Sequence, residues 1–119
     1  MRMTVIGTGY LGATHAACMA ELGHEVIGVD VDEAKIASLR DGKVPFFEPG
    51  LPEVLERNLE NGRLSFSTSY GDAAGFAHVH FLAVGTPQKR GSFAADLSYV
   101  RQVITSLVPL LEGDHIIFG

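Results

Sequence analysis

The chain has 119 residues, of which 46% are hydrophobic, and a formal net charge of −5 at pH 7. That length can close one hydrophobic core, and the acidic balance argues against a surface that binds nucleic acid. No apolar run approaches the roughly 20 residues that cross a bilayer, so we expect no membrane partner.

The first predicted strand, Met3–Ile6, runs directly into a Gly-x-Gly-x-x-Gly sequence formed by Gly7, Gly9 and Gly12. An alanine-rich segment, 10–22, predicts a helix after the glycines. Between a strand and a helix this spacing is typical of a loop that holds a pyrophosphate. The first glycine allows a tight turn, the second lets phosphates approach the backbone, and the third lets the helix pack closely on the sheet. The positive end of the helix dipole favours the phosphate charge.

A second predicted strand, Glu25–Val29, ends at Asp30, eighteen positions after Gly12. A carboxylate about 20 residues beyond the glycine loop is placed to bind the hydroxyls of the adenosine ribose. Its charge would repel a 2′-phosphate, so we expect NAD rather than NADP as the cofactor. Asp32 is predicted to cap a helix over 33–39.

Apolar runs in the remainder alternate with helical patterns. Buried strands are predicted at Leu64–Phe66, Val79–Val84 and His115–Phe118, and helices at Glu53–Leu59 and Leu97–Leu111. The last helix is predicted to be capped by Asp96 and buried through Val100, Val103, Ile104 and Leu107. This alternation predicts an α/β fold with a Rossmann-type doubly wound parallel sheet, truncated after the fifth strand. The outer edge of that strand would invite self-association.

Several motifs together resemble the N-terminal NAD-binding domain of the UDP-glucose 6-dehydrogenases. They are the glycine loop, Val29-Asp-Val-Asp32, Phe47-Glu-Pro-Gly-Leu51, Ala83-Val-Gly-Thr-Pro87 and Ala95-Asp-Leu-Ser-Tyr-Val100. The resemblance covers nearly the whole chain, 1–119. It implies an enzyme that oxidises the C6 hydroxyl of a nucleotide sugar to a carboxylate with two NAD molecules. Relatives of this kind are homodimers, so we expect the same of the parent protein.

The resemblance also extends the expected cofactor site. Tyr10 and Leu11 match loop residues that pass over the pyrophosphate, and Lys35 matches a basic position at the adenosine end. Val84, Gly85, Thr86 and Pro87 match the segment that lines the cofactor after the fourth strand. Glu48 lies in a segment that approaches the active site in relatives, and a purely structural role for it stays equally open.

Catalysis is expected to need residues outside this chain. In the family that the chain resembles, the cysteine that forms a thioester with the sugar, and the residues that assist it, lie beyond this segment. We expect no catalytic residue among the 119, and a nucleotide-sugar substrate bound mainly elsewhere. UDP-glucose is favoured, with GDP-mannose or a UDP-amino sugar as the alternative. A nucleotide-sensing regulatory module is a more distant alternative.

The cysteine and histidines favour plain structural roles. Cys18, the single cysteine, excludes an internal disulfide and is predicted to be a buried, unreactive thiol. His15 is predicted to lie on a helix surface. His78 and His80 could share one strand face, but no third ligand is near in sequence, so we expect no metal. Because the first strand begins close to Met1, we expect no signal peptide and a cytoplasmic setting.

Overall fold

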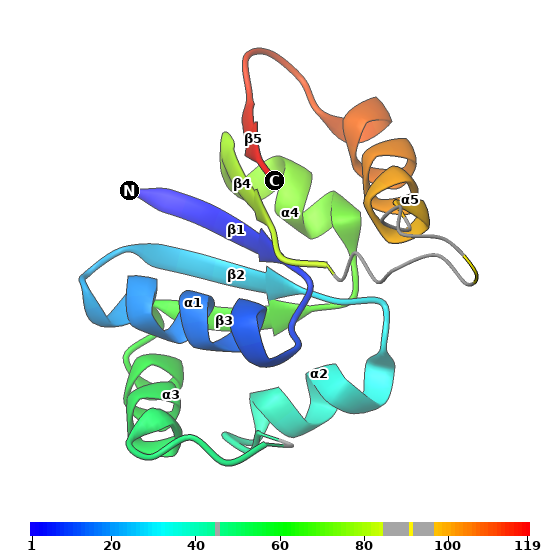
Figure 1. The fold of residues 1–119 in the computed structure, drawn as a ribbon. Coiled ribbons are helices and arrows are strands. Elements are labelled where there is room, and N and C mark those ends of the chain that lie inside the picture. Colours follow the sequence, from blue (N-terminus) through cyan, green and yellow to red (C-terminus); the bar gives the residue numbers. More distant parts are fainter. Residues whose placement is uncertain (45, 85–90, 92–96) are drawn as a thin grey trace.

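The computed structural model describes residues 1–44, 46–84, 91 and 97–119. They form a parallel sheet of five strands with helices on both faces, which confirms the predicted doubly wound α/β fold (Figure 1). The elements in chain order are β1 (Arg2–Ile6), α1 (Tyr10–Glu21), β2 (Glu25–Val29), α2 (Glu33–Arg40), α3 (Leu51–Glu60), β3 (Leu64–Ser67), α4 (Tyr70–Phe76), β4 (Val79–Leu82), α5 (Ser98–Leu107), a 3-10 turn (Val108–Leu110) and β5 (Ile116–Phe118). Within these residues, none of the helices is long and apolar enough to span a membrane.

The strand order is β3-β2-β1-β4-β5. The chain first adds β2 and β3 on one side of β1 and then adds β4 and β5 on the other side, so the order in which strands are added reverses at β1. Ile6, the last residue of β1, pairs with Val29 of β2 and with Leu82 of β4. The three strands therefore end at the same level, and the residues that follow them emerge side by side. This reversal point is where open α/β sheets bind their ligands.

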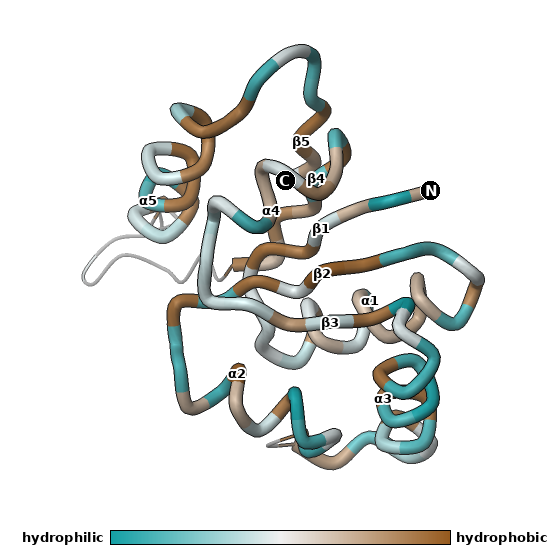
Figure 2. Tube along the Cα trace, turned by 180° about the vertical axis from the view of Figure 1, so that it is seen from behind, coloured by the Kyte–Doolittle hydropathy of each residue, from teal (hydrophilic) through white to brown (hydrophobic). Residues whose placement is uncertain are grey.

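Two apolar layers enclose the sheet, one on each face. Alternate strand residues separate them: Val5 packs in the layer of α1, α2 and α3, whereas Ile6 packs in the layer of α4 and α5. The small residues Ala13, Ala16 and Ala17 are buried and bring α1 close to the strands. Figure 2 shows the hydrophobic residues gathered in the strands and a mixture of hydrophobic and hydrophilic residues along α3.

Local signals explain most helix ends. Asp32 caps α2 as predicted, because its carboxylate accepts a hydrogen bond from the Lys35 amide at 3.1 Å.

The predicted helix 97–111 divides into α5 and the 3-10 turn. Pro109 explains the break, because it has no N–H to continue an α-helix. Helix α4 was not located from the sequence; the Ser69 hydroxyl caps it by accepting from the Asp72 amide. The predicted cap Asp96 lies outside the described residues.

Several residues that were predicted to be buried are exposed. Cys18 is exposed, because it faces away from the alanines that bury the other side of α1. Ile104 is exposed because Val103 and Leu107 form the inner face of α5. In β5, Ile116 and Phe118 are about half exposed since the strand lies at the edge of the sheet.

His15, predicted to lie on a helix surface, is partly buried instead. Its ring packs edge-on against Phe81 of β4, with the ring centroids 4.8 Å apart. The contact joins the middle of α1 to the sheet, so this side chain belongs to the interior of the layer.

Three histidines join β4 to the segment before β5. His78 and His80 lie against His115, at centroid distances of 4.5 and 5.1 Å. The Glu112 carbonyl must accept from Nε2 of His115, at 3.0 Å, so Nδ1 of a neutral His115 accepts from Nε2 of His80 at 2.9 Å. Nδ1 of His80 then accepts from the Thr4 hydroxyl at 2.6 Å. The buried ring of His80 is thus fully hydrogen-bonded in its neutral form.

Candidate functional site

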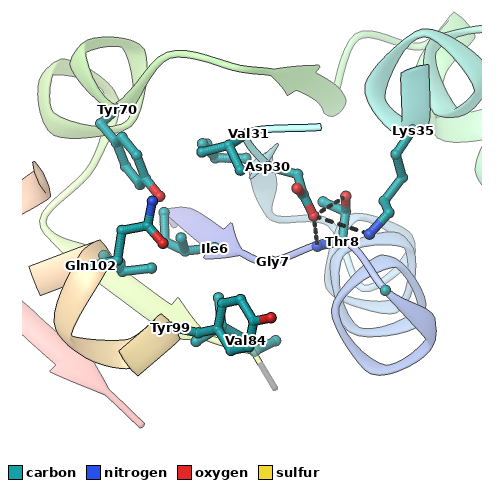
Figure 3. A pocket seen from close by; sticks show the side chains of 14 residues that line it. Ile6, Gly7, Thr8, Asp30, Val31, Lys35, Tyr70, Val84, Tyr99 and Gln102 are labelled. Atoms are coloured by element: carbon teal, nitrogen blue, oxygen red, sulfur yellow. Dashed lines mark hydrogen bonds and ion pairs between the residues drawn. The ribbon is translucent and has the colours of Figure 1, made fainter. Parts of the chain in front are cut away.

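A cavity of about 690 Å³ opens where β1, β2 and β4 end. Its lining comes from the first loop (Ile6, Gly7, Thr8, Gly9), from the end of β2 and the start of α2 (Val29, Asp30, Val31, Lys35), and from β4 with α4 and α5 (Tyr70, Ala83, Val84, Tyr99, Gln102, Val103). Figure 3 shows Asp30 near the centre of this lining, with Thr8 and Lys35 on one side and Tyr70 and Gln102 on the other.

The glycine loop is shaped by close backbone contacts. Gly7 has a φ of +99°, and a Cβ there would lie 2.9 Å from the backbone of Ala83. A Cβ on Gly12 would lie only 1.7 Å from the carbonyl oxygen of Gly7. Both positions therefore require glycine, one for its backbone conformation and the other for the tight contact between α1 and the loop.

Gly9 differs from its two neighbours in the motif. A Cβ at this position would meet no atom within 4 Å, and Gly9 is the N-cap of α1 without a side-chain capping bond. The space beside Gly9 at the start of α1 is therefore open, and an added side chain would occupy part of it. An uncapped helix start that is open to the cavity is suited to a phosphate group, so the loop fits a dinucleotide.

The Asp30 carboxylate is held in place by its neighbours. Its Oδ2 accepts hydrogen bonds from the Thr8 amide at 2.9 Å and the Thr8 hydroxyl at 3.0 Å, and Lys35 Nζ lies 3.6 Å away. Oδ1 accepts from the Asp32 amide at 3.0 Å. Each carboxylate oxygen has two acceptor sites. Oδ1 therefore keeps acceptor capacity that a ligand hydroxyl could use.

The charge state of Asp30 follows from opposing effects. Burial is the largest and raises its pKa, but the hydrogen bonds from Thr8 and Asp32 and the charge of Lys35 together outweigh it. The net result is a pKa below the ordinary value for aspartate, so the carboxylate is ionised at neutral pH. A fixed negative charge in this position accepts hydroxyl groups and repels phosphate.

Tyr10 turns from the glycine loop toward the segment between α2 and α3. Its hydroxyl donates to the Glu48 carboxylate, and its ring packs edge-on against Phe46 with centroids 4.9 Å apart. The hydrogen bond to Glu48 raises the pKa of Tyr10 above its ordinary value, and the charge of Glu48 acts in the same direction. The segment between α2 and α3 is thereby attached to the start of α1.

The predicted site residues fall into three groups. Gly7, Gly9, Asp30, Lys35 and Val84 line the cavity. Tyr10, Leu11 and Gly12 lie at the start of α1 beside it, with Tyr10 and Leu11 exposed and Gly12 buried against the loop. Gly85, Thr86 and Pro87 lie outside the described residues. The roles of all of them in cofactor binding remain predictions.

Sequence reasoning missed several residues that line the cavity. Thr8 occupies a variable position of the glycine motif, and no spacing rule connects it with Asp30. Tyr70, Tyr99 and Gln102 reach the cavity through the packing of α4 and α5. The available signal was that Tyr99 and Gln102 lie about one turn apart in the predicted last helix, and so on one side of it. No group of three or more metal-ligating side chains in the described part of the chain could hold a metal ion.

Comparison with known proteins gives consistent matches. The family model for the UDP-glucose/GDP-mannose dehydrogenase family, NAD binding domain, matches residues 1–119. The chain is 43% identical to the UDP-glucose 6-dehydrogenase of Rhizobium meliloti over 95% of its length and 26% of that enzyme. It is 44% identical to the GDP-mannose 6-dehydrogenase of Pseudomonas aeruginosa over 87% of its length and 23% of that enzyme.

The comparison with solved structures agrees with the comparison of sequences. The crystal structure of a ternary complex of the GDP-mannose dehydrogenase from Pseudomonas aeruginosa superimposes with a TM-score of 0.92 at 38% identity, covering 98% of this chain and 27% of that chain. The chain therefore spans about a quarter of the length of the relatives that it matches.

Proposed function

Because the chain belongs to the UDP-glucose/GDP-mannose dehydrogenase family, as its NAD-binding domain, we propose that it supplies the cofactor-binding part of an enzyme that oxidises a nucleotide sugar. NAD, when bound, accepts the hydride that leaves the sugar carbon. The task of these residues is to bind and orient the cofactor.

The observation that carries the proposal is the fixed carboxylate of Asp30 beside the open start of α1. The free acceptor site on Oδ1 would take a ribose hydroxyl, while the N–H groups after Gly9 would take the pyrophosphate. Lys35, 3.6 Å from Asp30, would lie at the adenosine end. The same carboxylate would reject the 2′-phosphate of NADP.

The other predicted residues would complete the site. Gly7 and Gly12 shape the loop, and Tyr10 and Leu11 would border the pyrophosphate. Val84, with the following Gly85-Thr-Pro87, would line the nicotinamide side at the end of β4. We propose that the catalytic residues of the enzyme lie outside these 119 residues.

The sugar substrate is part of the proposal. Identities of 43% to a UDP-glucose enzyme and 44% to a GDP-mannose enzyme favour neither sugar. We propose UDP-glucose on the Ala95-Asp-Leu-Ser-Tyr99 sequence, with a homodimeric parent enzyme in the cytoplasm. GDP-mannose is the second candidate because of the 0.92 TM-score to the GDP-mannose dehydrogenase structure.

Calorimetric titration of the protein with NAD and with NADP tests the cofactor site. We expect NAD to bind and NADP to bind at least about tenfold more weakly, and Asp30→Asn to reduce both NAD affinity and this discrimination. Glu60→Gln removes the same charge from an exposed position of α3 and should change neither. Equal affinity for the two cofactors would contradict the proposed role of Asp30.

Turnover is tested separately. We expect no NADH absorbance when the 119-residue chain is incubated with NAD and either UDP-glucose or GDP-mannose. NADH production from either sugar would show that catalytic residues lie within the chain.

A further inference from the structure

Three imidazole rings lie against one another where β5 joins the sheet. Val79 of β4 pairs with Ile116 of β5. His78 and His115, each one position earlier, therefore lie opposite one another, and His80 shares their face of the sheet. We infer that the three rings form a pH-sensitive clasp, which holds β5 to β4 while the rings are neutral and releases β5, with the other strands still folded, when they gain protons.

The neutral rings form a continuous chain of hydrogen bonds from the segment before β5 to β1. Nε2 of His115 donates to the Glu112 carbonyl at 3.0 Å, and Nδ1 of His115 accepts from Nε2 of His80 at 2.9 Å. Nδ1 of His80 accepts from the Thr4 hydroxyl at 2.6 Å. The segment before β5 is therefore bonded to β4 through a side chain that is itself bonded to β1.

An added proton disrupts this chain. On His115 it must enter at Nδ1, which faces the Nε2–H of His80, so two donors would oppose one another at 2.9 Å. That clash is relieved only if His80 moves its own proton to Nδ1, which forces the Thr4 hydroxyl to turn from donor to acceptor. A proton added to His80 places a charge on a side chain with no exposed surface. The pKa of His80 is accordingly lowered to about 4, first by burial and then by His115 and His78.

His78 can take a proton at Nε2, because its Nδ1 already donates to the Asp114 carbonyl at 2.8 Å. The charge then lies on a ring whose centroid is 4.5 Å from that of His115. In the described part of the chain, no carboxylate forms an ion pair with any of the three rings. The ionisable side chains on the surrounding elements are Arg2 in β1, Tyr70 and Asp72 in α4, Tyr99 and Arg101 in α5, and Glu112 and Asp114 before β5. A second proton in the cluster therefore meets like charge without a paired anion.

Beyond the histidines, β5 is weakly held. It is three residues long and lies at the edge of the sheet beside β4 (Figure 1). Its Phe118 ring stacks on Phe81 but is 50% exposed, and Ile116 is 56% exposed. Among the described residues, the buried members of the two apolar layers come from other elements. Release of β5 therefore leaves both layers intact and gives His80 access to water, where its ring binds a proton more tightly.

Amide hydrogen exchange followed by NMR between pH 7 and pH 5 tests the clasp, with protection factors that correct for the direct effect of pH on exchange. The Ile116 amide, which donates to the His78 carbonyl at 2.8 Å, reports on β5. The Val26 amide, which donates to the Arg63 carbonyl at 2.7 Å, reports on the opposite half of the sheet. We expect Ile116 protection to fall at least about tenfold over this range.

Low concentrations of urea separate release of β5 from unfolding of the whole domain. At pH 5 they should accelerate exchange of the Val26 amide and leave the Ile116 amide unaffected, because only global unfolding exposes much surface. Equal protection and equal urea dependence of the two amides in the wild type would show that β5 leaves only when the domain unfolds, and would overturn the clasp.

Two variants separate the cluster from other effects of acid. His80→Gln can still donate to Nδ1 of His115 but takes no proton, so the fall in Ile116 protection should be reduced to about threefold or less. His24→Gln removes an imidazole from the turn before β2 and should keep the wild-type fall. Ile116 protection that is independent of pH in the wild type, or an undiminished fall in His80→Gln, overturns the assignment to the histidines.

Discussion

The backbone amide and the hydroxyl of Thr8 both donate to one carboxylate oxygen of Asp30, at 2.9 and 3.0 Å. Thr8 is fully buried, so these bonds are shielded from water. They connect the glycine loop after β1 directly to the residue after β2. The loop proposed to hold the phosphates therefore also orients the side chain proposed to hold the ribose.

Thr8→Val keeps the amide and the shape of the side chain but removes the hydroxyl. Because a hydrogen bond to a charged group contributes roughly 1.5–3 kcal/mol, we expect the free energy of unfolding at neutral pH to fall by about 1–2 kcal/mol. The pKa of Asp30 should rise and NAD should bind several-fold more weakly. Urea unfolding and NAD titration measure the two effects.

The pH dependence of this variant has a definite sign. The folded pKa of Asp30 lies below its ordinary value of 3.8, so its stabilising effect is present above that pH and disappears below it. The difference between wild type and Thr8→Val should therefore shrink as the pH falls below 3.8. Thr8→Ser keeps the hydroxyl and should retain most of the stability at neutral pH. Equal loss in both variants would show that the stability depends on the packing of the whole Thr8 side chain as much as on its hydroxyl.

Two alanine substitutions in the glycine loop should separate folding from binding. At Gly12 the new Cβ would lie 1.7 Å from the Gly7 carbonyl oxygen, and backbone on both sides resists the shift, so we expect a destabilisation of about 3 kcal/mol. At Gly9 the Cβ meets nothing within 4 Å, so the loss of stability should stay below about 1 kcal/mol.

The NAD affinities should follow a different order from the stabilities. The Gly9→Ala side chain occupies the space in front of the helix start, so NAD affinity should fall by about tenfold or more in a protein that remains folded. Urea unfolding and calorimetry on the same preparations give both numbers. Normal NAD affinity in Gly9→Ala would exclude the pyrophosphate from this position.

The glycine loop and Asp30 were predictable because their physical requirements are local. Gly7 needs a positive φ, and the residue after a parallel strand necessarily emerges at the carboxyl edge of the sheet. The alternation of strands and helices gave the fold class for a similar reason. Helix α4 was missed because it is short and contains two glycines, and its stability comes from packing on β1, β2 and α5 rather than from helix propensity.

The far end of the cavity could not be predicted in the same way. Tyr70 and Gln102 are more than thirty positions apart, and both are more than thirty from Asp30. Their approach depends on how α4 and α5 cross the sheet, which no periodicity encodes. The three-histidine cluster has the same cause, since His115 meets His78 and His80 only through the pairing of β4 with β5.

His80 should make the protein sensitive to mild acid. Burial is the main cause that lowers its pKa from 6.5 to about 4, with His115 and His78 contributing. Because the pKa of His80 is lower in the folded protein than in the unfolded chain, the unfolded chain binds the proton more tightly. Protonation of His80 therefore lowers the free energy of unfolding. Stability is therefore fully present above pH 6.5 and falls until about pH 4, by at most about 3 kcal/mol.

His80→Gln provides the comparison, because its amide stays neutral and can still donate to Nδ1 of His115. Urea unfolding between pH 7 and pH 4 should give a shallower pH dependence for the variant than for the wild type, even if its stability at pH 7 is lower. Parallel curves for the two proteins would assign the acid sensitivity to other groups.

Asn58 joins α1, α3 and the turn before β3 through buried hydrogen bonds. Its side-chain nitrogen donates to the Val54 carbonyl at 2.8 Å and to Glu21 Oε2 at 3.4 Å. Its oxygen accepts from Asn61 and from Arg63, each at 3.3 Å. Because Asn58 has no exposed surface, every partner that is lost leaves a polar group with little access to water.

Arg57, the preceding residue, makes the shorter contact with the same glutamate, at 2.7 Å, but with both side chains exposed to water. Exposed ion pairs contribute little, so Arg57→Ala should lower the free energy of unfolding by less than about 1 kcal/mol. Asn58→Ala should lower it by about 2–3 kcal/mol, because buried groups lose their partners and a cavity forms. Urea unfolding of the two variants compares them directly. If Arg57→Ala proves the more damaging, the ion pair, rather than the buried amide, joins α3 to α1.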